Sequence, residues 1–230
     1  MKTVHYEGFA LYVEEGDALG VGHEQNGFNY EREVTNALAQ CINSSTVFVD
    51  VGAGYGHYML VAKAVARGCT YLGIDPRMSH VQCITATIQK NQFDRAGIVY
   101  GAAWSETGVV DLVTKNLPES GLTHVGKGGD AFVPAFKLDD IVARVDLMKI
   151  DTEGAESHVL RGMSRLLREC KPVIVFEYNP AMSVRTTQWP TIWTTLSRAG
   201  YAIYSLPDIK QILDVPTIVA PNYLAVCTSH

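Results

Sequence analysis

Apolar and polar positions follow different patterns in the first 45 residues and in the rest of the chain. Residues 1–27 are polar and rich in glycine, with one apolar run at 9–13 that fits a short hairpin. Apolar residues then fall on one face of the segment 29–42, which predicts a helix capped by Asn29. Because glycines recur before this helix, we expect no long element there. The pattern predicts an N-terminal extension with its helix over residues 1–45 and a core domain over residues 46–230.

In the core domain, short apolar runs alternate with segments of helical period. The expected strands span 46–51, 70–74, 98–100, 108–113, 132–137, 145–151, 172–178, 201–206 and 222–228. The expected helices span 56–67, 78–91, 155–169 and 187–199, with a helical turn at 138–142. This alternation predicts an α/β fold with a mostly parallel sheet and helices on both faces.

Three glycines at alternate positions, Gly52, Gly54 and Gly56, follow the first core strand. Glycines let the backbone turn sharply and approach a ligand, and the next helix points its free N–H groups at the same place. A dinucleotide fingerprint would need a third glycine at position 57, where the chain has His57. The spacing instead resembles the first motif of class I S-adenosylmethionine-dependent methyltransferases, in which the loop holds the methionine end of the cofactor.

The second core strand ends at Asp75, which Pro76 follows. A carboxylate at this strand tip can accept hydrogen bonds from both ribose hydroxyls, and its distance from the glycine loop fits that role. Trp104 follows the third strand and either stacks on adenine or packs in the core. The residues expected to bind S-adenosylmethionine are Asp50, Gly52, Ala53, Gly54, Gly56, Asp75, Pro76, Ala103, Trp104 and Asp151.

A second cluster of acids lies at the end of the expected strand 145–151 and just after it. Asp151 ends this strand, and Glu153 and Glu156 come next on a turn and a helix start. Ligands of open α/β sheets bind beyond the carboxyl ends of the strands, where Asp50 and Asp75 are also expected. Acids gathered at one edge cost free energy unless they bind something. Glu156 is equally well explained by the dipole of a helix N-terminus.

Five segments together resemble the FkbM-type methyltransferase family in order and spacing. They are 48–56, 137–140, 147–156, 160–162 and 171–177, and the most specific is Lys149-Ile150-Asp151-Thr152-Glu153-Gly154-Ala155-Glu156. The resemblance implies a Rossmann-like class I methyltransferase sheet of about seven strands. It also implies S-adenosylmethionine-dependent methylation, mostly of oxygen in natural products, glycans or lipids. The family often has Asn where this chain has Gly54, and residues 1–28 and those after 178 carry little resemblance.

The chemistry implied is an SN2 methyl transfer to a hydroxyl group on a small molecule, glycan or lipid. An alcohol is a weak nucleophile at neutral pH, so a general base helps. Asp151 is the first candidate for this base, Glu153 the second and His57 the third, although a helix-start role explains His57 better. An alternative places Mg²⁺ on Asp151, Glu177 and Asn179. We favour pairing of Glu177 with a basic side chain or a backbone group over this metal site.

The net charge of −5 and the sequence pI of about 5.8 argue against a broad surface for nucleic acid. An RNA 2′-O-methyltransferase, the first alternative, would need a Lys-Asp-Lys-Glu tetrad. Lys63, Asp151 and Glu177 are present, but the other lysine is missing. The second alternative is a non-catalytic scaffold that binds S-adenosylmethionine, against which the acids at the strand tips argue. His57 in place of a third glycine disfavours a nicotinamide dehydrogenase.

The five cysteines are scattered and include no Cys-x-x-Cys pair, so we expect neither a zinc site nor a disulfide framework. The chain shows no apolar signal core and no run of membrane-spanning length, and we expect a cytoplasmic protein. The sequence leaves open whether the chain forms a homo-oligomer. Residues 1–28 and the glycine-rich loop 115–131 are expected to form a lid over cofactor and acceptor.

Overall fold

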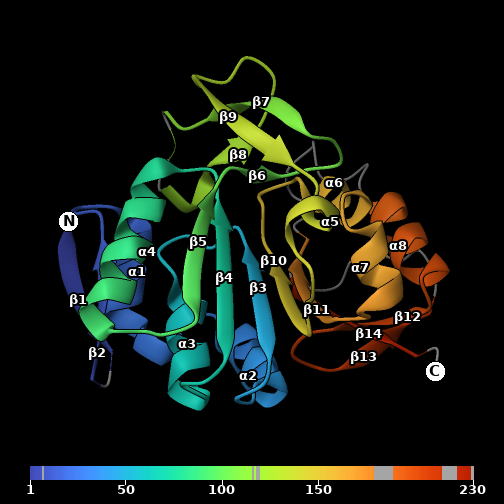
Figure 1. Cartoon of the computed structure of the whole chain (residues 1–230), viewed down its shortest axis with the longest axis horizontal. Helices are drawn as coiled ribbons and strands as arrows, with labels where there is room; N and C mark the ends of the chain where they lie inside the picture. Colours follow the sequence, from blue (N-terminus) through green and yellow to red (C-terminus); the bar gives the residue numbers. More distant parts are fainter. Residues whose placement is uncertain (7, 116, 118–119, 179–188, 214–221, 229–230) are drawn as a thin grey trace.

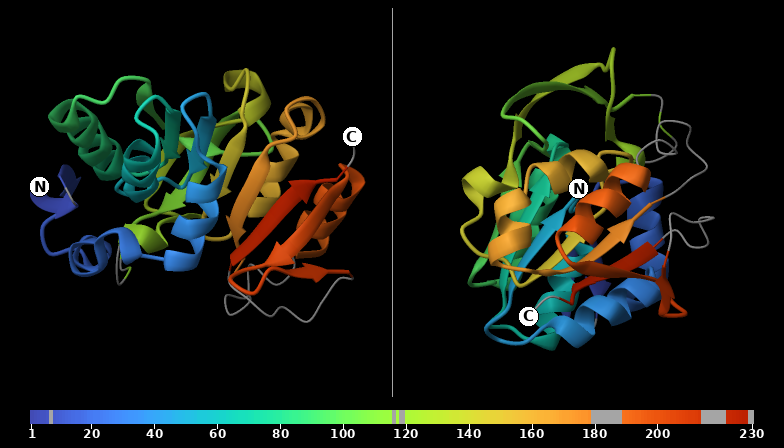
Figure 2. Two further views of the ribbon diagram at one scale, coloured as in Figure 1. Left: turned by 90° about the horizontal axis from the view of Figure 1, so that it is seen from below. Right: turned by 90° about the vertical axis from the view of Figure 1, so that its right-hand side faces the viewer.

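The computed structural model describes residues 1–6, 8–115, 117, 120–178, 189–213 and 222–228. A large central sheet carries helices on both faces (Figures 1 and 2). A two-stranded hairpin formed by the start of the chain lies at the left of Figure 1, and a four-stranded sheet lies at its top. Within this described part, no helix has both the length and the apolar character needed to cross a membrane.

Five parallel strands form the middle and one side of the central sheet. They are β3 (Val47–Val51), β4 (Thr70–Asp75), β5 (Ala96–Tyr100), β10 (Leu147–Ile150) and β11 (Val173–Glu177). The other side consists of β12 (Tyr201–Ser205), β13 (Lys210–Ile212) and β14 (Asn222–Cys227), and its pairings are antiparallel. The order β13-β12-β14-β11-β10-β3-β4-β5 confirms the mostly parallel sheet, with eight strands where about seven were expected.

The central strands are apolar on both sides because helices cover both faces. On one face lie α2 (Arg32–Cys41), α3 (His57–Val65) and α4 (Met78–Asn91). On the other lie α5 (Leu138–Ile141), α6 (Glu156–Arg161), α7 (Ser164–Glu169) and α8 (Trp189–Arg198). Each face of the sheet has its own apolar core. Along β3, Phe48 packs in the core under α2, α3 and α4, whereas Val49 and Val51 pack in the core on the opposite face. Successive side chains of a strand point to opposite faces, so one run supplies two cores.

The segment expected as one helix at 155–169 is two helices, α6 and α7. The chain bends at Gly162, where a Cβ atom would lie 2.0 Å from the backbone oxygen of Trp104. Only glycine allows two backbones to approach so closely. The break therefore comes from tertiary packing, which the helical period of the sequence does not reveal.

The first 30 residues contain more regular structure than expected. The hairpin of β1 (Lys2–Tyr6) and β2 (Phe9–Val13) leads to α1 (Ala18–Asn26) and to a 3₁₀ turn, η1 (Gly27–Asn29). The glycines were expected to break any long element here, yet α1 is a helix of 9 residues. Gly20 lies inside α1, and a Cβ atom there would lie 3.0 Å from Cβ of Val13. This glycine lets the helix pack closely on the hairpin.

The helix α2 begins three residues later than expected, at Arg32. Asn29 lies in η1 and does not cap it; the preceding residue is Glu31, whose φ of 41° and ψ of 57° are left-handed. Such a backbone is uncommon for a residue with a side chain. Thr35 holds it in place, because its N–H donates to the Glu31 oxygen at 2.9 Å and its hydroxyl donates to the Tyr30 oxygen at 2.9 Å.

The hairpin is attached to α4 by side chains. Oδ1 of Asn91 accepts from the N–H of Ala10 at 2.9 Å, and Nδ2 of Asn91 donates to the oxygen of Ala10 at 2.7 Å. The hydroxyl of Thr87 accepts from the N–H of Tyr12 at 3.0 Å. These bonds satisfy backbone groups of β2 that would otherwise pair with another strand.

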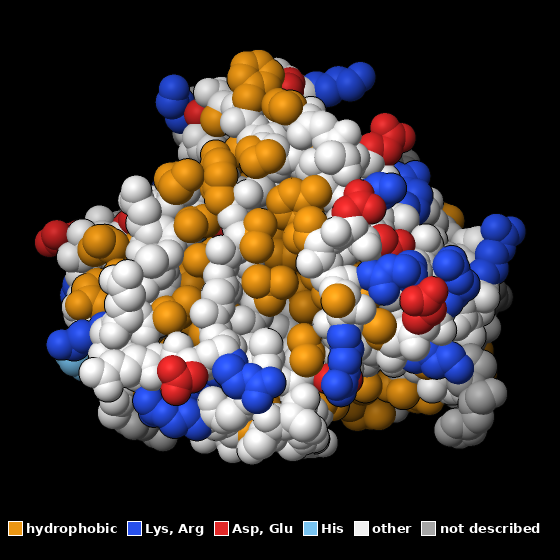
Figure 3. Space-filling model, in the orientation of Figure 1, with side chains coloured by type: hydrophobic (Ala, Val, Ile, Leu, Met, Phe, Trp, Pro, Cys, Tyr) orange, Lys and Arg blue, Asp and Glu red, His pale blue; other side chains and the backbone are white. Residues whose placement is uncertain are grey.

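The residues between β5 and α5 form a separate four-stranded sheet. It consists of β6 (Ala102–Ala103), β7 (Gly108–Val113), β8 (His124–Val125) and β9 (Ala131–Phe136), with a 3₁₀ turn, η2 (Ser120–Leu122). β7 and β9 match expected strands, whereas β6 and β8 are too short to show a period. Val109 and Phe132 are 69% and 73% exposed. Apolar side chains accordingly show at the top of Figure 3.

Candidate functional site

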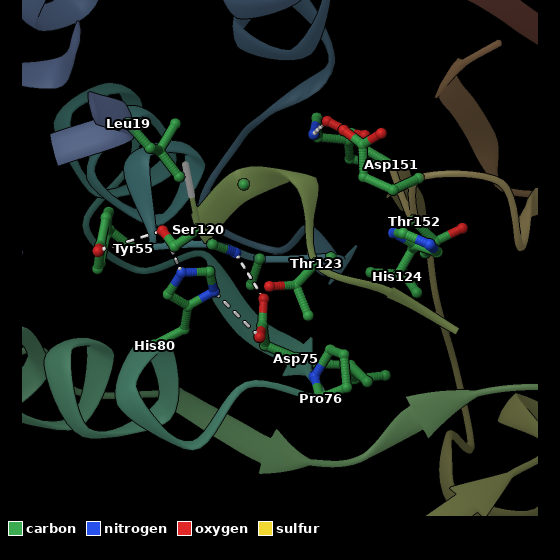
Figure 4. Close-up of a pocket in the computed structure, with 18 of the residues that line it drawn as sticks. Leu19, Tyr55, Asp75, Pro76, His80, Ser120, Thr123, His124, Asp151 and Thr152 are labelled. Carbon is green, nitrogen blue, oxygen red and sulfur yellow. Dashed lines mark hydrogen bonds and ion pairs between the residues drawn. The ribbon is translucent and has the colours of Figure 1, made fainter. Parts of the chain in front are cut away.

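One cavity opens at the carboxyl ends of β3, β4, β10 and β11, and its volume is about 300 Å³. Ligand sites typically measure roughly 300–1,000 Å³. Its wall combines the strand ends and the loops after them, the segment from α1 to α2, and the segment from η2 to β8. Asp75 and Asp151 lie toward opposite ends of this cavity, as Figure 4 shows. Both segments expected to form a lid contribute residues to the wall.

The loop after β3 has the backbone that its glycines permit. Gly52, Gly54 and Gly56 have φ of 80°, 54° and 86°. A Cβ atom at Gly52 would lie 1.7 Å from the backbone oxygen of Asp151, so this position accepts no side chain. The loop thus joins the ends of β3 and β10 at the floor of the cavity.

Asp75 ends β4 and is held by neighbours before any ligand arrives. Its Oδ2 accepts from the N–H of Gly54 at 2.9 Å. Its Oδ1 accepts from the N–H of Arg77 at 2.8 Å and lies 3.1 Å from Nδ1 of His80. The side chain is buried and lines the cavity. Because each carboxylate oxygen has more than one lone pair, Asp75 retains capacity to accept from a ligand.

A chain of hydrogen bonds connects Asp75 to the N-terminal segment. Nε2 of His80 lies 2.9 Å from Oγ of Ser120, which donates to Oδ2 of Asp17 at 2.8 Å. Figure 4 shows the part of this chain that runs from Asp75 to Ser120. Burial tends to raise the pKa of Asp17, but hydrogen bonds from Ser120 and Tyr55 outweigh it and lower the pKa. The η2 turn is therefore fastened to both α4 and the start of α1.

The opposite end of the cavity is charged. Nζ of Lys149 lies 2.7 Å from Oδ2 of Asp151, and the Lys149 side chain is 5% exposed. Carboxylate oxygens of Asp151, Glu153 and Glu177 lie within 4.8 Å of one another. Burial alone would lower the pKa of Lys149, but Asp151 and Glu31 outweigh it and raise the pKa. Burial and Asp151 raise the pKa of Glu177 to about 10, so this carboxyl is protonated at neutral pH.

Glu31 brings a further acid from the N-terminal segment to this end. The Tyr58 hydroxyl donates to Oε2 of Glu31, and Nζ of Lys149 lies 4.7 Å from the centroid of the Tyr58 ring. Burial raises the pKa of Glu31, Lys149 opposes the rise, and Asp151 adds to it; the net result is a raised pKa. Residues from α3, from β10 and its following loop, and from the turn before α2 therefore form one charged wall.

His57 lines the cavity but is only 3% exposed. Its Nε2 lies 3.2 Å from Oγ1 of Thr35, and its ring stacks on His23 with centroids 5.3 Å apart. Burial and the neighbouring His23 lower the pKa of His57 well below its usual value. The neutral imidazole shapes the wall between the glycine loop and the N-terminal segment.

The sequence motifs at both ends of the cavity correspond to a known family. The family described as Methyltransferase FkbM domain matches residues 50–203, more than half of the chain. The chain belongs to the FkbM methyltransferase family. This finding confirms the family expected from the sequence. No curated protein sequence matches the chain.

Solved structures are similar in fold to this FkbM-family chain. A methyltransferase FkbM from Methylobacillus flagellatus KT gives a TM-score of 0.57 at 20% identity, over 80% of this chain and 44% of that one. A putative caffeoyl-CoA O-methyltransferase from Staphylococcus aureus gives 0.54 at 10% identity, over 93% of each chain. A Pyrococcus abyssi tRNA (uracil-54, C5)-methyltransferase, in complex with S-adenosyl-L-homocysteine, gives a TM-score of 0.52 at 13% identity, over 97% of this chain and 43% of that one. These likenesses confirm the class I methyltransferase fold.

Three residues expected to bind the cofactor lie outside the cavity wall of this FkbM-family chain. Asp50 is fully buried beneath it; its Oδ2 accepts from the Tyr71 hydroxyl at 2.8 Å, and burial raises its pKa to about 7. Gly56 precedes α3, and Trp104 stacks on His158 with ring centroids 3.7 Å apart. These three residues support the cavity from behind its wall in this structure, and a direct contact of any of them with the cofactor stays a prediction. The expected residues that line the cavity are Gly52, Ala53, Gly54, His57, Asp75, Pro76, Ala103, Asp151, Glu153 and Glu177.

The magnesium alternative gains no support from the structure or the comparisons. Asn179 lies outside the described residues. Asp151 is already held by the Lys149 ammonium, with which a cation at Asp151 would have to compete. Glu177 pairs with Asp151 through a hydrogen bond, which replaces the expected pairing with a basic or backbone group.

The Lys-Asp-Lys-Glu tetrad of the RNA alternative is not assembled here. Nζ of Lys63 donates to the backbone oxygens of Cys69 and Asp94 at 2.6 and 2.8 Å. These two residues precede β4 and β5, at the sheet edge opposite the cavity. Lys63 is thus a structural lysine of the FkbM-family fold.

Sequence reasoning missed four residues of the site: His80, Ser120, Lys149 and Glu31. Lys149 carried a usable signal, because a lysine inside an apolar strand must find acidic partners when buried. His80 lies one helical turn beyond Asp75 and could have been paired with it. Ser120 and Glu31 lie in segments without periodicity, and only the folded chain brings them to the cavity.

Proposed function

We propose that this FkbM-family protein transfers a methyl group from S-adenosylmethionine to a hydroxyl group on a small molecule, a glycan or a lipid. One observation carries the proposal: a single cavity has the glycine loop and Asp75 at one end and a charged wall at the other. Such a cavity can hold a nucleoside cofactor and an acceptor side by side.

S-adenosylmethionine supplies a methyl group on a positively charged sulfur. The residues at the glycine-loop end fit this cofactor. Asp75 offers carboxylate oxygens to the ribose hydroxyls, and its position is fixed by Gly54, Arg77 and His80. Gly54 has an open, left-handed backbone that lets a ligand lie against the main chain.

The acceptor hydroxyl is assigned to the charged end, beside Asp151 and Glu153. Holding two reactants in line supplies a large part of the acceleration in a transfer reaction. Asp151 is oriented by Lys149, so its carboxylate can receive and position a hydroxyl group. Glu153 lines the same end with a left-handed φ of 55°. His57 is kept as a wall residue between cofactor and acceptor.

We further propose that residues 1–45 form an extension that closes over the core domain, 46–230, together with the loop 115–131. Leu19 supports this idea because its side chain lies 3.3 Å from where a Cβ atom of Gly121 would be and 3.7 Å from that of Gly54. The extension, the η2 segment and the glycine loop therefore meet at one point above the cavity.

Calorimetric titration with S-adenosylmethionine and S-adenosylhomocysteine tests the cofactor site first. Wild type should bind both compounds, and Asp75→Ala should lose both. Transfer of a radiolabelled methyl group to catechols, glycosides, polyols and hydroxylated lipids then tests the reaction. Wild type that binds neither compound contradicts the proposal. Binding without transfer to any hydroxylated class favours the scaffold alternative, and transfer to RNA alone favours the RNA alternative.

A further inference from the structure

Two of the acids at the charged end of the cavity, Asp151 and Glu31, differ in how readily they can take a proton. Oδ2 of Asp151 forms an ion pair with Nζ of Lys149 at 2.7 Å. Asp151 also accepts a hydrogen bond from the protonated Glu177. Hydrogen bonds and a neighbouring cation both favour the ionised form of a carboxyl, which makes it a poorer base. Asp151 is therefore suited to orienting a hydroxyl group and poorly suited to removing its proton.

Glu31 reaches the same end from the turn before α2. Its left-handed backbone, φ 41° and ψ 57°, is held by Thr35 through bonds to the Glu31 and Tyr30 oxygens. Thr35 is in turn in contact with His57 of the cavity wall, at 3.2 Å. Backbone conformations of this kind concentrate at functional sites, where the surrounding structure holds them in place. The turn delivers the Glu31 carboxylate to the cavity.

The partners of Glu31 leave it able to accept a proton. The Tyr58 hydroxyl, which is neutral, donates a hydrogen bond to its carboxylate, and no ammonium of the described residues is in ion-pair contact with it. The groups that face it are Tyr58 from α3, Lys149 and Asp151 from β10 and its following loop, Glu177 from β11, and Glu33 from α2. Burial, the largest influence, raises the pKa of Glu31 above its ordinary value, which makes the carboxylate a stronger base.

We propose that Glu31 is the general base that takes the proton of the acceptor hydroxyl, while Asp151 and Lys149 position its oxygen. This inference rests on the proposed methyl transfer. The O–H proton passes to the Glu31 carboxylate as an oxygen lone pair forms a bond to the methyl carbon. The electrons of the breaking S–C bond stay on sulfur, which becomes a neutral thioether, and Glu31 later releases its proton to water. The N-terminal extension thereby supplies a catalytic residue as well as a cover.

Three variants separate this role from the alternatives: Glu31→Gln, Asp151→Asn and Glu33→Gln. Glu33 is the matched control, since it lies two residues away, outside the cavity wall, and accepts a hydrogen bond from Asn222. Binding of S-adenosylhomocysteine by Glu31→Gln should stay within about twofold of wild type. Methyl transfer to the catechol and glycoside probes should fall by roughly 10²–10⁴-fold, the usual contribution of a general base. Glu33→Gln should retain the wild-type rate.

The pH profile distinguishes a base from a structural residue. In wild type the rate should rise with pH as Glu31 loses its proton, and in Glu31→Gln the residual rate should no longer show that rise. Asp151→Asn should raise KM for the acceptor more than it alters this profile. A Glu31→Gln variant with the wild-type rate and profile overturns the proposal, as does an Asp151→Asn variant that alone abolishes the rise.

Infrared difference spectroscopy gives a readout that needs no acceptor. Spectra are recorded from mildly acidic to mildly alkaline pH, with and without S-adenosylhomocysteine. The protonated-carboxyl band that disappears with rising pH should be weaker in Glu31→Gln than in wild type and Glu33→Gln, because Asp50 contributes to this band in all three. Identical spectra for wild type and Glu31→Gln overturn the proposal. Failure of wild type to bind S-adenosylhomocysteine instead contradicts the proposed function, so the two failures are separable.

Discussion

The two ends of the cavity are built on different principles. At the glycine-loop end, Asp75, His80, Ser120 and Asp17 are joined in sequence by hydrogen bonds of 2.8–3.1 Å. At the charged end, acids crowd around the single ammonium of Lys149, and several pKa values are displaced as a result. The first end holds its groups in fixed positions, which suits the proposed cofactor binding, whereas the second keeps charges close together, which suits the proposed chemistry. Displaced pKa values are a feature of reactive sites.

Gly52→Ala should have the largest effect, because it damages both ends at once. The new Cβ atom would lie 1.7 Å from the Asp151 oxygen on a backbone with φ of 80°. We expect loss of S-adenosylhomocysteine binding and a fall in stability of about 3 kcal/mol or more. Calorimetric titration and chemical denaturation measure the two effects. Gly97→Ala, whose Cβ atom meets nothing within 4 Å, should behave as wild type. Equal behaviour of the two variants contradicts the assignment.

Asp75→Asn should damage the glycine-loop end alone. A hydrogen bond to a charged group contributes about 1.5–3 kcal/mol, and Asn keeps one acceptor oxygen, so the loss of one such bond to ribose should weaken S-adenosylhomocysteine binding by about 10- to 100-fold. Adenosine binding should weaken to a similar extent, as titration would show. Asp140→Asn is the control, because Asp140 is paired with Lys137, and neither lines the cavity. An unchanged affinity in Asp75→Asn would remove the main support for a nucleoside cofactor.

Ser120→Ala should have a smaller effect, because Ser120 acts through its neighbours. The variant breaks the chain between His80 and Asp17 while leaving Asp75 in place. We expect up to about tenfold weaker binding of S-adenosylhomocysteine, since one or two hydrogen bonds of about 1 kcal/mol are lost. Hydrogen exchange around Asp17 should become faster. Thr85→Ala, an exposed hydroxyl on α4, provides the control. Unaltered exchange would show that η2 does not fasten the extension.

Glu177→Gln should have the smallest effect on cofactor binding, and its main effect should be on how stability depends on pH. The pKa of Glu177 is raised from 4.5 to about 10. Between these two pH values the folded protein therefore keeps a proton on Glu177 that the unfolded chain has lost. Stability of wild type should therefore fall as the pH rises from about 5 to about 9, at most by about 1.4 kcal/mol per pH unit for this group. The variant should fall less steeply in denaturation experiments. Asp50, with a pKa raised to about 7, contributes a decline of the same sign to both proteins.

The parts predictable from the sequence are those that obey local rules. The glycine spacing and the acids at the ends of β4 and β10 follow from strand period and turn chemistry, and they located the cavity floor. The class I methyltransferase layout of the sheet came from the family resemblance and is confirmed. The helix α1 was missed because its glycines serve close packing on Val13, which local propensity does not include.

The side walls of the cavity were not predictable in the same way. Trp104 was expected either to stack on adenine or to pack in the core, and it stacks on His158 of α6. Lys63 was considered for a catalytic tetrad, yet it binds backbone oxygens at the opposite edge. In both cases the direction of a side chain depends on contacts between distant segments. The residues that sequence reasoning missed, Glu31 and Ser120 among them, share this dependence.

The attachment of the hairpin to α4 has an evolutionary consequence. Asn91 and Thr87 bind the backbone of Ala10 and Tyr12, so the N-terminal extension is joined here to the surface of a helix and adds no strand to the central sheet. Side chains of the extension can therefore change without shifting the register of the catalytic core. Relatives with the same cofactor loop could diverge in their acceptors by exchanging this one segment.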